Sequence, residues 1–174
     1  MEDLLQSVQS VLATTPARWL NLVETVPVEL LTRPPAHEEW SALECLQHLL
    51  DTEQVVFSTR LRAFMAGQDL EVFDPSTRST APPASREPAE LVAIFAECRA
   101  ASLVTLNQVT PADLSRTARH PELGVVSIRQ MLHQWAAHDL MHTVQAERAM
   151  MQPFIAESGP WQVYFADHEV KSLT

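Results

Sequence analysis

The chain has 174 residues, 46% hydrophobic and 20% charged, which is typical of a globular protein with one domain, here expected over residues 1–174. The formal net charge of −10 argues against nucleic acid as a partner, because phosphate binding requires a basic surface. We expect no membrane span, because no run approaches roughly 18 apolar residues, and no signal peptide, because the N-terminus is acidic and amphipathic. Cys45 and Cys98 form no CxxC motif and are expected to be reduced core residues of a cytoplasmic protein.

The first expected helix covers residues 2–26, where apolar residues recur at intervals of three and four. Pro16 interrupts this pattern, and Thr15 before it is a candidate N-cap. The segment is therefore either one kinked helix or two shorter helices. The run TRPPAHEE then ends any helix. The apolar positions are Leu4, Leu5, Val8, Val11, Leu12, Trp19, Leu22, Val23 and Val26.

The second expected helix covers residues 41–66. Ser41 is followed three residues later by Glu44, which is the spacing of a capping box, and Gly67 is a typical C-terminal stop. Glu44 is also a candidate metal ligand or general base, but capping is the simpler role. The connection 67–87 is rich in turn-forming residues, and loops of this length are usually functional, mobile or crossover segments. The main apolar stripe of the helix is Leu43, Leu46, Leu50, Phe57, Leu61 and Phe64.

Two further helices are expected, over residues 87–108 and 127–151. The later one begins with a second capping box, formed by Ser127 and Gln130, and TPAD at residues 110–113 is typical of a short capped turn. The run RHPELG is expected to be a loop, no segment shows convincing strand alternation, and the aromatic residues of the tail GPWQVYFADHEV favour packing against the helices. Four helices of roughly 20 to 25 residues predict an all-α fold, a four-helix bundle.

Two histidines lie in the middle of the apolar face of the last expected helix. With His138 at the origin of a helical wheel, His142 falls at about 40° and Trp135 at about 60°, whereas His133 falls at about 220°, on the opposite face. A single buried histidine is more often a hydrogen-bonded core residue than a ligand. Two imidazoles on successive turns both need partners, and one metal ion satisfies both. The spacing places their Cβ atoms roughly 5–6 Å apart, as in HExxH sites, but Asp139 stands where that motif has its glutamate.

A metal site in a helical bundle needs a third ligand from another helix. His48 is the best candidate, although on its own wheel it lies at the edge of a broad apolar arc and not on the main stripe. Asp139 and Gln145 flank the other two ligands and are either hydrogen-bond partners that orient the imidazoles or helix-surface residues. Ligation requires neutral imidazoles, so metal binding is expected to weaken as the pH falls through about 6.5. The other histidines lie in loops or the tail and are expected to be solvated: His37, His120 and His168.

The motifs around these histidines extend the metal hypothesis. The second helix begins with WSALECLQH, of the form W-S-x-x-E-x-x-x-H, and the fourth contains HDLMHTVQ, of the form H-D-x-x-H-x-x-Q. Together with RPPAHEEW, FDP, RHPELG and GPWQVYF, they resemble the DinB/YfiT-like metalloenzyme family over essentially the whole chain. The resemblance implies an up-down-down-up four-helix bundle in which the connection 67–87 crosses the bundle. It also implies a divalent-metal site formed by His48, His138 and His142.

The resemblance implies a metal-dependent enzyme that acts on a small molecule, either a hydrolase or an S-transferase that uses a low-molecular-weight thiol. Three neutral imidazoles around zinc leave a fourth position for water or substrate, and nickel and iron also accept imidazole. Such an ion lowers the pKa of bound water to about 7, or activates a thiolate. The alternatives are a metal-stabilised or stress-associated protein without catalysis, and a metal-free helical interaction module. Family habit also favours a homodimer.

Overall fold

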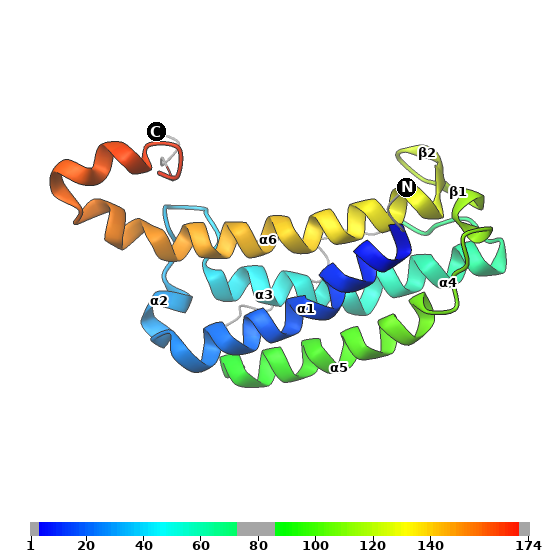
Figure 1. Cartoon of the computed structure of the whole chain (residues 1–174), viewed down its shortest axis with the longest axis horizontal. Coiled ribbons are helices and arrows are strands. Elements are labelled where there is room, and N and C mark those ends of the chain that lie inside the picture. The colour runs from blue at the N-terminus through cyan, green and yellow to red at the C-terminus, as the bar shows by residue number, and fades with distance from the viewer. Residues whose placement is uncertain (1–3, 73–85, 171–174) are drawn as a thin grey trace.

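Four long helical segments form one bundle in the computed structural model, which describes residues 4–72 and 86–170 (Figure 1). The first and last segments run in one direction along the bundle and the two between them run in the other, which confirms the predicted up-down-down-up order. None of the described helices is long and apolar enough to cross a membrane. The segments are α1 (Leu4–Thr25), α3 (Ala42–Thr52) continuing through η1 (Glu53–Phe57) into α4 (Ser58–Ala66), α5 (Pro88–Leu106) and α6 (Ile128–Ala156).

Side chains cap the helices that begin at the two predicted capping boxes. The Glu44 amide donates to Ser41 Oγ at 3.3 Å, and Glu44 Oε2 accepts from the Ser41 amide at 2.7 Å. Ser127 and Gln130 form the same reciprocal pair at the start of α6. Gly67 ends α4 with φ of 69°, a left-handed conformation that glycine adopts without a Cβ clash. The carboxylate of Glu44 therefore acts as a helix cap, which is the role that was favoured over metal ligand or general base.

The helices keep the predicted order but differ from it in detail. α1 is one helix that includes Pro16, which is one of the two predicted alternatives, and α6 extends beyond the predicted end at residue 151 to Ala156. An additional short helix, α2 (Val28–Thr32), follows α1. The second predicted helix is continuous, but η1 within it has π-helical hydrogen bonding. The connection 67–87 was predicted to cross the length of the bundle. Residues 73–85 of this connection lie outside the described residues.

A small β-hairpin precedes α6, although no segment of the sequence shows convincing strand alternation. β1 (Thr117–His120) pairs antiparallel with β2 (Gly124–Ser127), and RHPELG, predicted to be a loop, supplies the end of β1 and the turn. Strands of four residues give too few alternations to be distinguished from a loop in the sequence. The predicted capped turn before them is a 3-10 turn (Asp113–Ser115), in which Asp113 Oδ2 accepts from the Thr110 amide at 2.9 Å.

The tail forms a 3-10 segment, η5 (Gly159–Phe165), beyond the end of α6. Its aromatic side chains do not pack on the bundle as predicted, because Trp161 is 65% exposed and Tyr164 is 77% exposed. Side chains of α6 hold the tail through its backbone carbonyls instead: Arg148 Nη2 donates to the carbonyl oxygen of Glu169 at 2.6 Å. The tail is thus attached to α6 through its backbone carbonyls, and not through the aromatic side chains that were expected to pack there.

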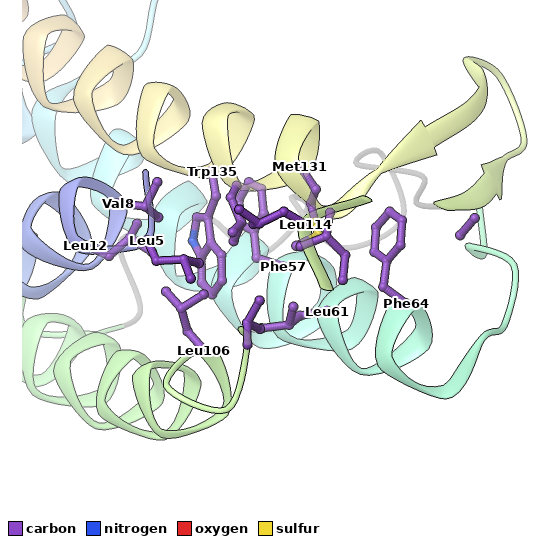
Figure 2. Close-up of a cluster of buried hydrophobic side chains, with 14 of the residues drawn as sticks. Leu5, Val8, Leu12, Phe57, Leu61, Phe64, Leu106, Leu114, Met131 and Trp135 are labelled. Atoms are coloured by element: carbon purple, nitrogen blue, oxygen red, sulfur yellow. The ribbon is translucent and has the colours of Figure 1, made fainter. Parts of the chain in front are cut away.

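Two apolar clusters fill the bundle. Figure 2 shows the one in which the rings of Phe57 and Trp135 stack with centroids 5.1 Å apart. The other includes Trp19 and Cys45 and is bordered by Cys98. Both cysteines are free, as predicted, and burial raises the pKa of Cys45 to about 12. Cys45 is therefore a neutral core side chain at physiological pH.

A buried ionic network joins the four segments of the bundle. Arg99, on α5, is only 1% exposed. Its Nη1 donates to Asp139 Oδ2 on α6 at 2.6 Å and to the Leu12 carbonyl oxygen on α1 at 2.9 Å. Its Nη2 donates to Glu53 Oε2 in η1 at 2.9 Å. One planar guanidinium therefore connects α5 to each of the other three segments, a role that requires several donors in fixed directions.

We expect Arg99→Met to lower the free energy of unfolding by about 3–5 kcal/mol, because it leaves Glu53 and Asp139 buried without a cationic partner. Urea denaturation monitored by circular dichroism measures this change. The matched control is Arg18→Met on the exposed side of α1, which should change the stability by no more than about 0.5 kcal/mol. Equal effects of the two substitutions would contradict the role assigned to Arg99.

Candidate metal centre

The bundle brings together the three histidines that the sequence nominated. His48 lies on α3, and His138 and His142 lie on successive turns of α6. The Nε2 atoms of His48 and His138 are 3.1 Å apart, and one nitrogen from each of the three residues lies within 4.8 Å of the others. His142 is buried, and the other two are partly exposed. The histidines therefore form a cluster between two helices that is partly exposed to solvent.

The distance between the two Nε2 atoms fits a shared metal ion. Zinc binds imidazole nitrogen at about 2.0–2.1 Å, so two nitrogens of a tetrahedral site lie roughly 3.3 Å apart. The observed 3.1 Å between His48 and His138 is close to that value. It also permits a hydrogen bond if one of the two nitrogens carries a proton. Both arrangements require that the two imidazoles are not charged together.

Aromatic side chains surround the imidazoles. Trp40, immediately before the N-cap of α3, stacks on His142 with ring centroids 5.7 Å apart and contacts His48 at 4.9 Å. Phe57 meets His138 edge-on at 5.2 Å. These rings restrict the orientation of the imidazoles and exclude water from part of their surface. Trp40 was not nominated from the sequence, although it is the first residue of the motif that leads to His48.

Burial keeps the imidazoles neutral. Together with the charges of the neighbouring imidazoles, it lowers the pKa of His48 to about 4 and the pKa of His138 to about 3. Burial also lowers the pKa of His142. Protons therefore compete for these nitrogens only at a pH well below 6.5, the value expected for an unperturbed histidine. The three side chains are ready to act as ligands at neutral pH without losing a proton.

The two residues that flank the ligands have different roles. His142 Nδ1 lies 2.9 Å from Gln145 Oε1, and because an amide oxygen only accepts, Nδ1 is the donor and Nε2 keeps its lone pair. Gln145 therefore orients a ligand, which was one of the two predicted roles. Asp139 is not a surface residue, because it is buried and both its oxygens accept hydrogen bonds from Arg99. His138 Nδ1 is buried and has no hydrogen-bond partner among the described residues.

The remaining histidines are distributed mostly as predicted. His133 is exposed on the opposite face of α6, and His37 and His168 are also exposed. His120 was expected to be solvated, which was wrong, because it is 9% exposed at the end of β1. Its Nδ1 accepts hydrogen bonds from two backbone amides of the hairpin turn, at 3.2 and 3.3 Å. The ring is buried because the backbone of the hairpin turn folds over it and donates these two hydrogen bonds to its Nδ1 atom.

The family model of the DinB superfamily matches residues 12–146, which include all three clustered histidines. The chain belongs to the DinB superfamily. Its fold is similar to that of YfiT from Bacillus subtilis, described as "a probable metal-dependent hydrolase with an unusual four-helix bundle topology", with a TM-score of 0.77 and 16% sequence identity over 88% of this chain and 89% of that one. At this identity the likeness shows a shared fold. A comparison with curated proteins gave no match.

The lowered pKa values predict that the metal-free protein loses stability as the pH falls from about 6.5 to about 4. In this window the unfolded chain protonates the two histidines while the folded chain keeps them neutral, so acid favours unfolding. Urea denaturation at pH 7 and pH 5 measures the loss. In the variant His138→Gln, whose amide does not titrate, the loss should be smaller. The same loss in both proteins would show that His138 is not held neutral by the fold.

Proposed function

We propose that His48, His138 and His142 bind one divalent ion and that the protein is a metal-dependent hydrolase of a small molecule. The observation that carries this proposal is the cluster of three neutral imidazoles with two Nε2 atoms 3.1 Å apart. Three protein ligands are typical of catalytic zinc sites, which keep a position for water or substrate, and nickel or iron also suits imidazole. When bound, such an ion lowers the pKa of its water to about 7 and polarises a carbonyl or phosphoryl oxygen.

The surrounding residues support this use of the cluster. Gln145 holds the His142 ring so that Nε2 is available as a ligand. Trp40 and Phe57 restrict the rings and keep water from part of their surface. Because burial already keeps the imidazoles neutral, ligation at neutral pH does not have to displace protons from them. The residues thus supply an oriented, deprotonated set of nitrogen ligands.

Thiol-dependent group transfer is the second candidate function, because the open position of a three-histidine site accepts a thiolate as well as water. Turnover of ester, amide and phosphoester substrates by the metal-loaded protein, with and without a low-molecular-weight thiol, separates the two. Activity only with the thiol supports transfer, whereas activity without it supports hydrolysis. Tight metal binding with no turnover in either assay would favour a metal-stabilised protein.

Each of His48→Ala, His138→Ala and His142→Ala should lower the affinity for zinc sharply, because each removes one of three ligands. Competition with a chromophoric chelator measures the affinity, using protein without a polyhistidine tag, and elemental analysis gives the stoichiometry. Gln145→Leu should lower the affinity about 10–100-fold, as expected when a partner that orients a ligand is lost.

The matched control for these substitutions is His133→Ala, which removes an exposed imidazole from the other face of α6. It should bind one zinc ion with unchanged affinity. If this variant lost the metal while His138→Ala kept it, the assignment of the site to the cluster would be wrong. A stoichiometry of zero for the unmodified protein would favour the metal-free helical module instead.

We also propose that the protein forms a homodimer through the outer face of α6. Leu140, Met141 and Val144 lie at three- and four-residue spacing on this helix, and all three are exposed to solvent. Exposed apolar residues that adjoin on one face are typical of a protein–protein interface. A second copy would cover them with the same face, as two-fold symmetry requires.

The variant Val144→Glu should shift the protein from dimer to monomer, because it places a charge in the proposed interface. Sedimentation velocity over a concentration series measures the mass. Val104→Glu on α5 is the matched control, because Val104 and Val144 are both 62% exposed. It should leave the mass unchanged. A monomer mass for the unmodified protein at every concentration would remove the proposal.

A further inference from the structure

A pocket of about 680 Å³ lies at the end of the bundle that carries the β-hairpin. Its size is within the range of small-molecule binding sites. None of the three clustered histidines lines it, so it is distinct from the candidate metal centre. The polar side chains that line it are Arg60 from α4, His120 from β1, Glu122 from the hairpin turn, and Gln130 and Gln134 from α6.

Hydrogen bonds within the protein determine which donor and acceptor groups of His120 and Gln130 remain free to bind a ligand. His120 Nδ1 accepts from the amides of Glu122 and Leu123, so the neutral ring carries its proton on Nε2 and has a donor left. Gln130 Oε1 accepts from both the amide and the hydroxyl of Ser127, which leaves the amide NH₂ of Gln130 as a donor. Each residue has used its acceptor in the local fold, so what remains for a ligand is an N–H group.

Arg60 adds a cationic donor to the pocket. It makes no hydrogen bond or ion pair of hydrogen-bond length with the described residues. Burial lowers its pKa, so its charge is poorly solvated, and the charge of Glu122 partly offsets this effect. One guanidinium beside one exposed carboxylate leaves little net charge, which suits a ligand with a single negative charge better than a dianion.

We propose that this pocket binds a small amphiphilic monocarboxylate. The carboxylate accepts hydrogen bonds from the donors of Arg60, His120 and Gln130, and charge-assisted bonds from a guanidinium are the strongest of these. The rest of the ligand lies against apolar lining residues. These are Leu70, Val72, Leu123, Val126 and Met131.

One lining residue of the pocket lies a single helical turn from the candidate metal centre on α6. Gln134 lines the pocket, and His138 lies one helical turn further on the same face. If the proposed hydrolase function is correct, the pocket is suited to hold the carboxylate end of a substrate next to the metal centre. Binding of the carboxylate itself rests on Arg60 and does not depend on that function.

Isothermal titration of the full-length protein with octanoate tests the proposal, with octanamide as the uncharged probe of equal length. Octanoate should bind saturably and about tenfold or more tightly than octanamide, because only the carboxylate gains charge-assisted hydrogen bonds. Arg60→Gln should remove this preference. Arg62→Gln, at an exposed position two residues further along α4, is the matched control and should keep it.

A second pair of variants guards against a folding defect in Arg60→Gln. Leu123→Asp places a negative charge in the pocket at a position that is 72% exposed, so the fold should tolerate it, and octanoate should bind at least tenfold more weakly. Glu122→Gln removes a negative charge from the lining and should strengthen binding. Equal binding of octanoate and octanamide, or no effect of these variants, would overturn the proposal.

Carboxylates also bind metal ions, so the titration is repeated with the metal-free protein and with His138→Ala. Octanoate binding that survives in both belongs to the pocket, even if the proposed metal function fails. Binding that disappears in both would place the carboxylate at the histidine cluster and would overturn the assignment to Arg60.

Discussion

The buried guanidinium of Arg99 is the constraint on which the arrangement of the helices depends. A charge that is 1% exposed is tolerated only when it is paired and its donors are satisfied, and here the partners come from three other helical segments. If any one segment slid along the bundle, a buried carboxylate or carbonyl would lose its partner. Apolar packing alone tolerates such sliding better, because one aliphatic contact replaces another at similar energy.

This network also positions the histidine cluster. Asp139 follows His138 directly on α6, and Glu53 lies five residues after His48 on the continuous segment from α3 to η1. Fixing both carboxylates on one guanidinium fixes the two helices that carry the ligands relative to each other. The 3.1 Å separation of the two Nε2 atoms is thus supported from the core by ionic hydrogen bonds.

The π-helical turn η1 links the network to the aromatic core. It has one more residue per hydrogen-bonded turn than an α-helix, and within it Glu53 and Phe57 are both buried. Glu53 binds Arg99, while Phe57 stacks on Trp135 and touches the edge of His138. The same turn therefore contributes to the ionic network, the apolar core and the wall of the candidate metal centre. Such irregular turns are frequent at functional sites.

The sequence predicted the parts of this arrangement that depend on periodicity and local hydrogen bonding. The wheel placed His138 and His142 on one face because that face is apolar over many turns, and the capping boxes follow from residue type and spacing alone. Glu53 and Arg99 were not nominated, because a charged residue in a helix usually faces solvent and only its tertiary partners show otherwise. For the same reason the sequence left open whether Asp139 is buried or lies on the helix surface. Trp161 and Tyr164 were misplaced because aromatic character favours burial but does not supply a surface to pack against.

Burial of the histidines has two opposing consequences, and both follow from the same desolvation. It removes protons from the imidazoles at neutral pH, which favours ligation of a metal, and it takes polar nitrogens out of water, which destabilises the fold unless they find partners. Gln145 satisfies one nitrogen of His142, whereas His138 Nδ1 has no partner among the residues described. A metal ion would accept the lone pairs of both facing Nε2 atoms. A hydrogen bond between the two rings uses the lone pair of only one of these atoms, because the other must carry the proton. On this argument a shared metal ion satisfies the two facing Nε2 atoms better than a hydrogen bond does, which favours the metal proposal over a purely structural role for the cluster.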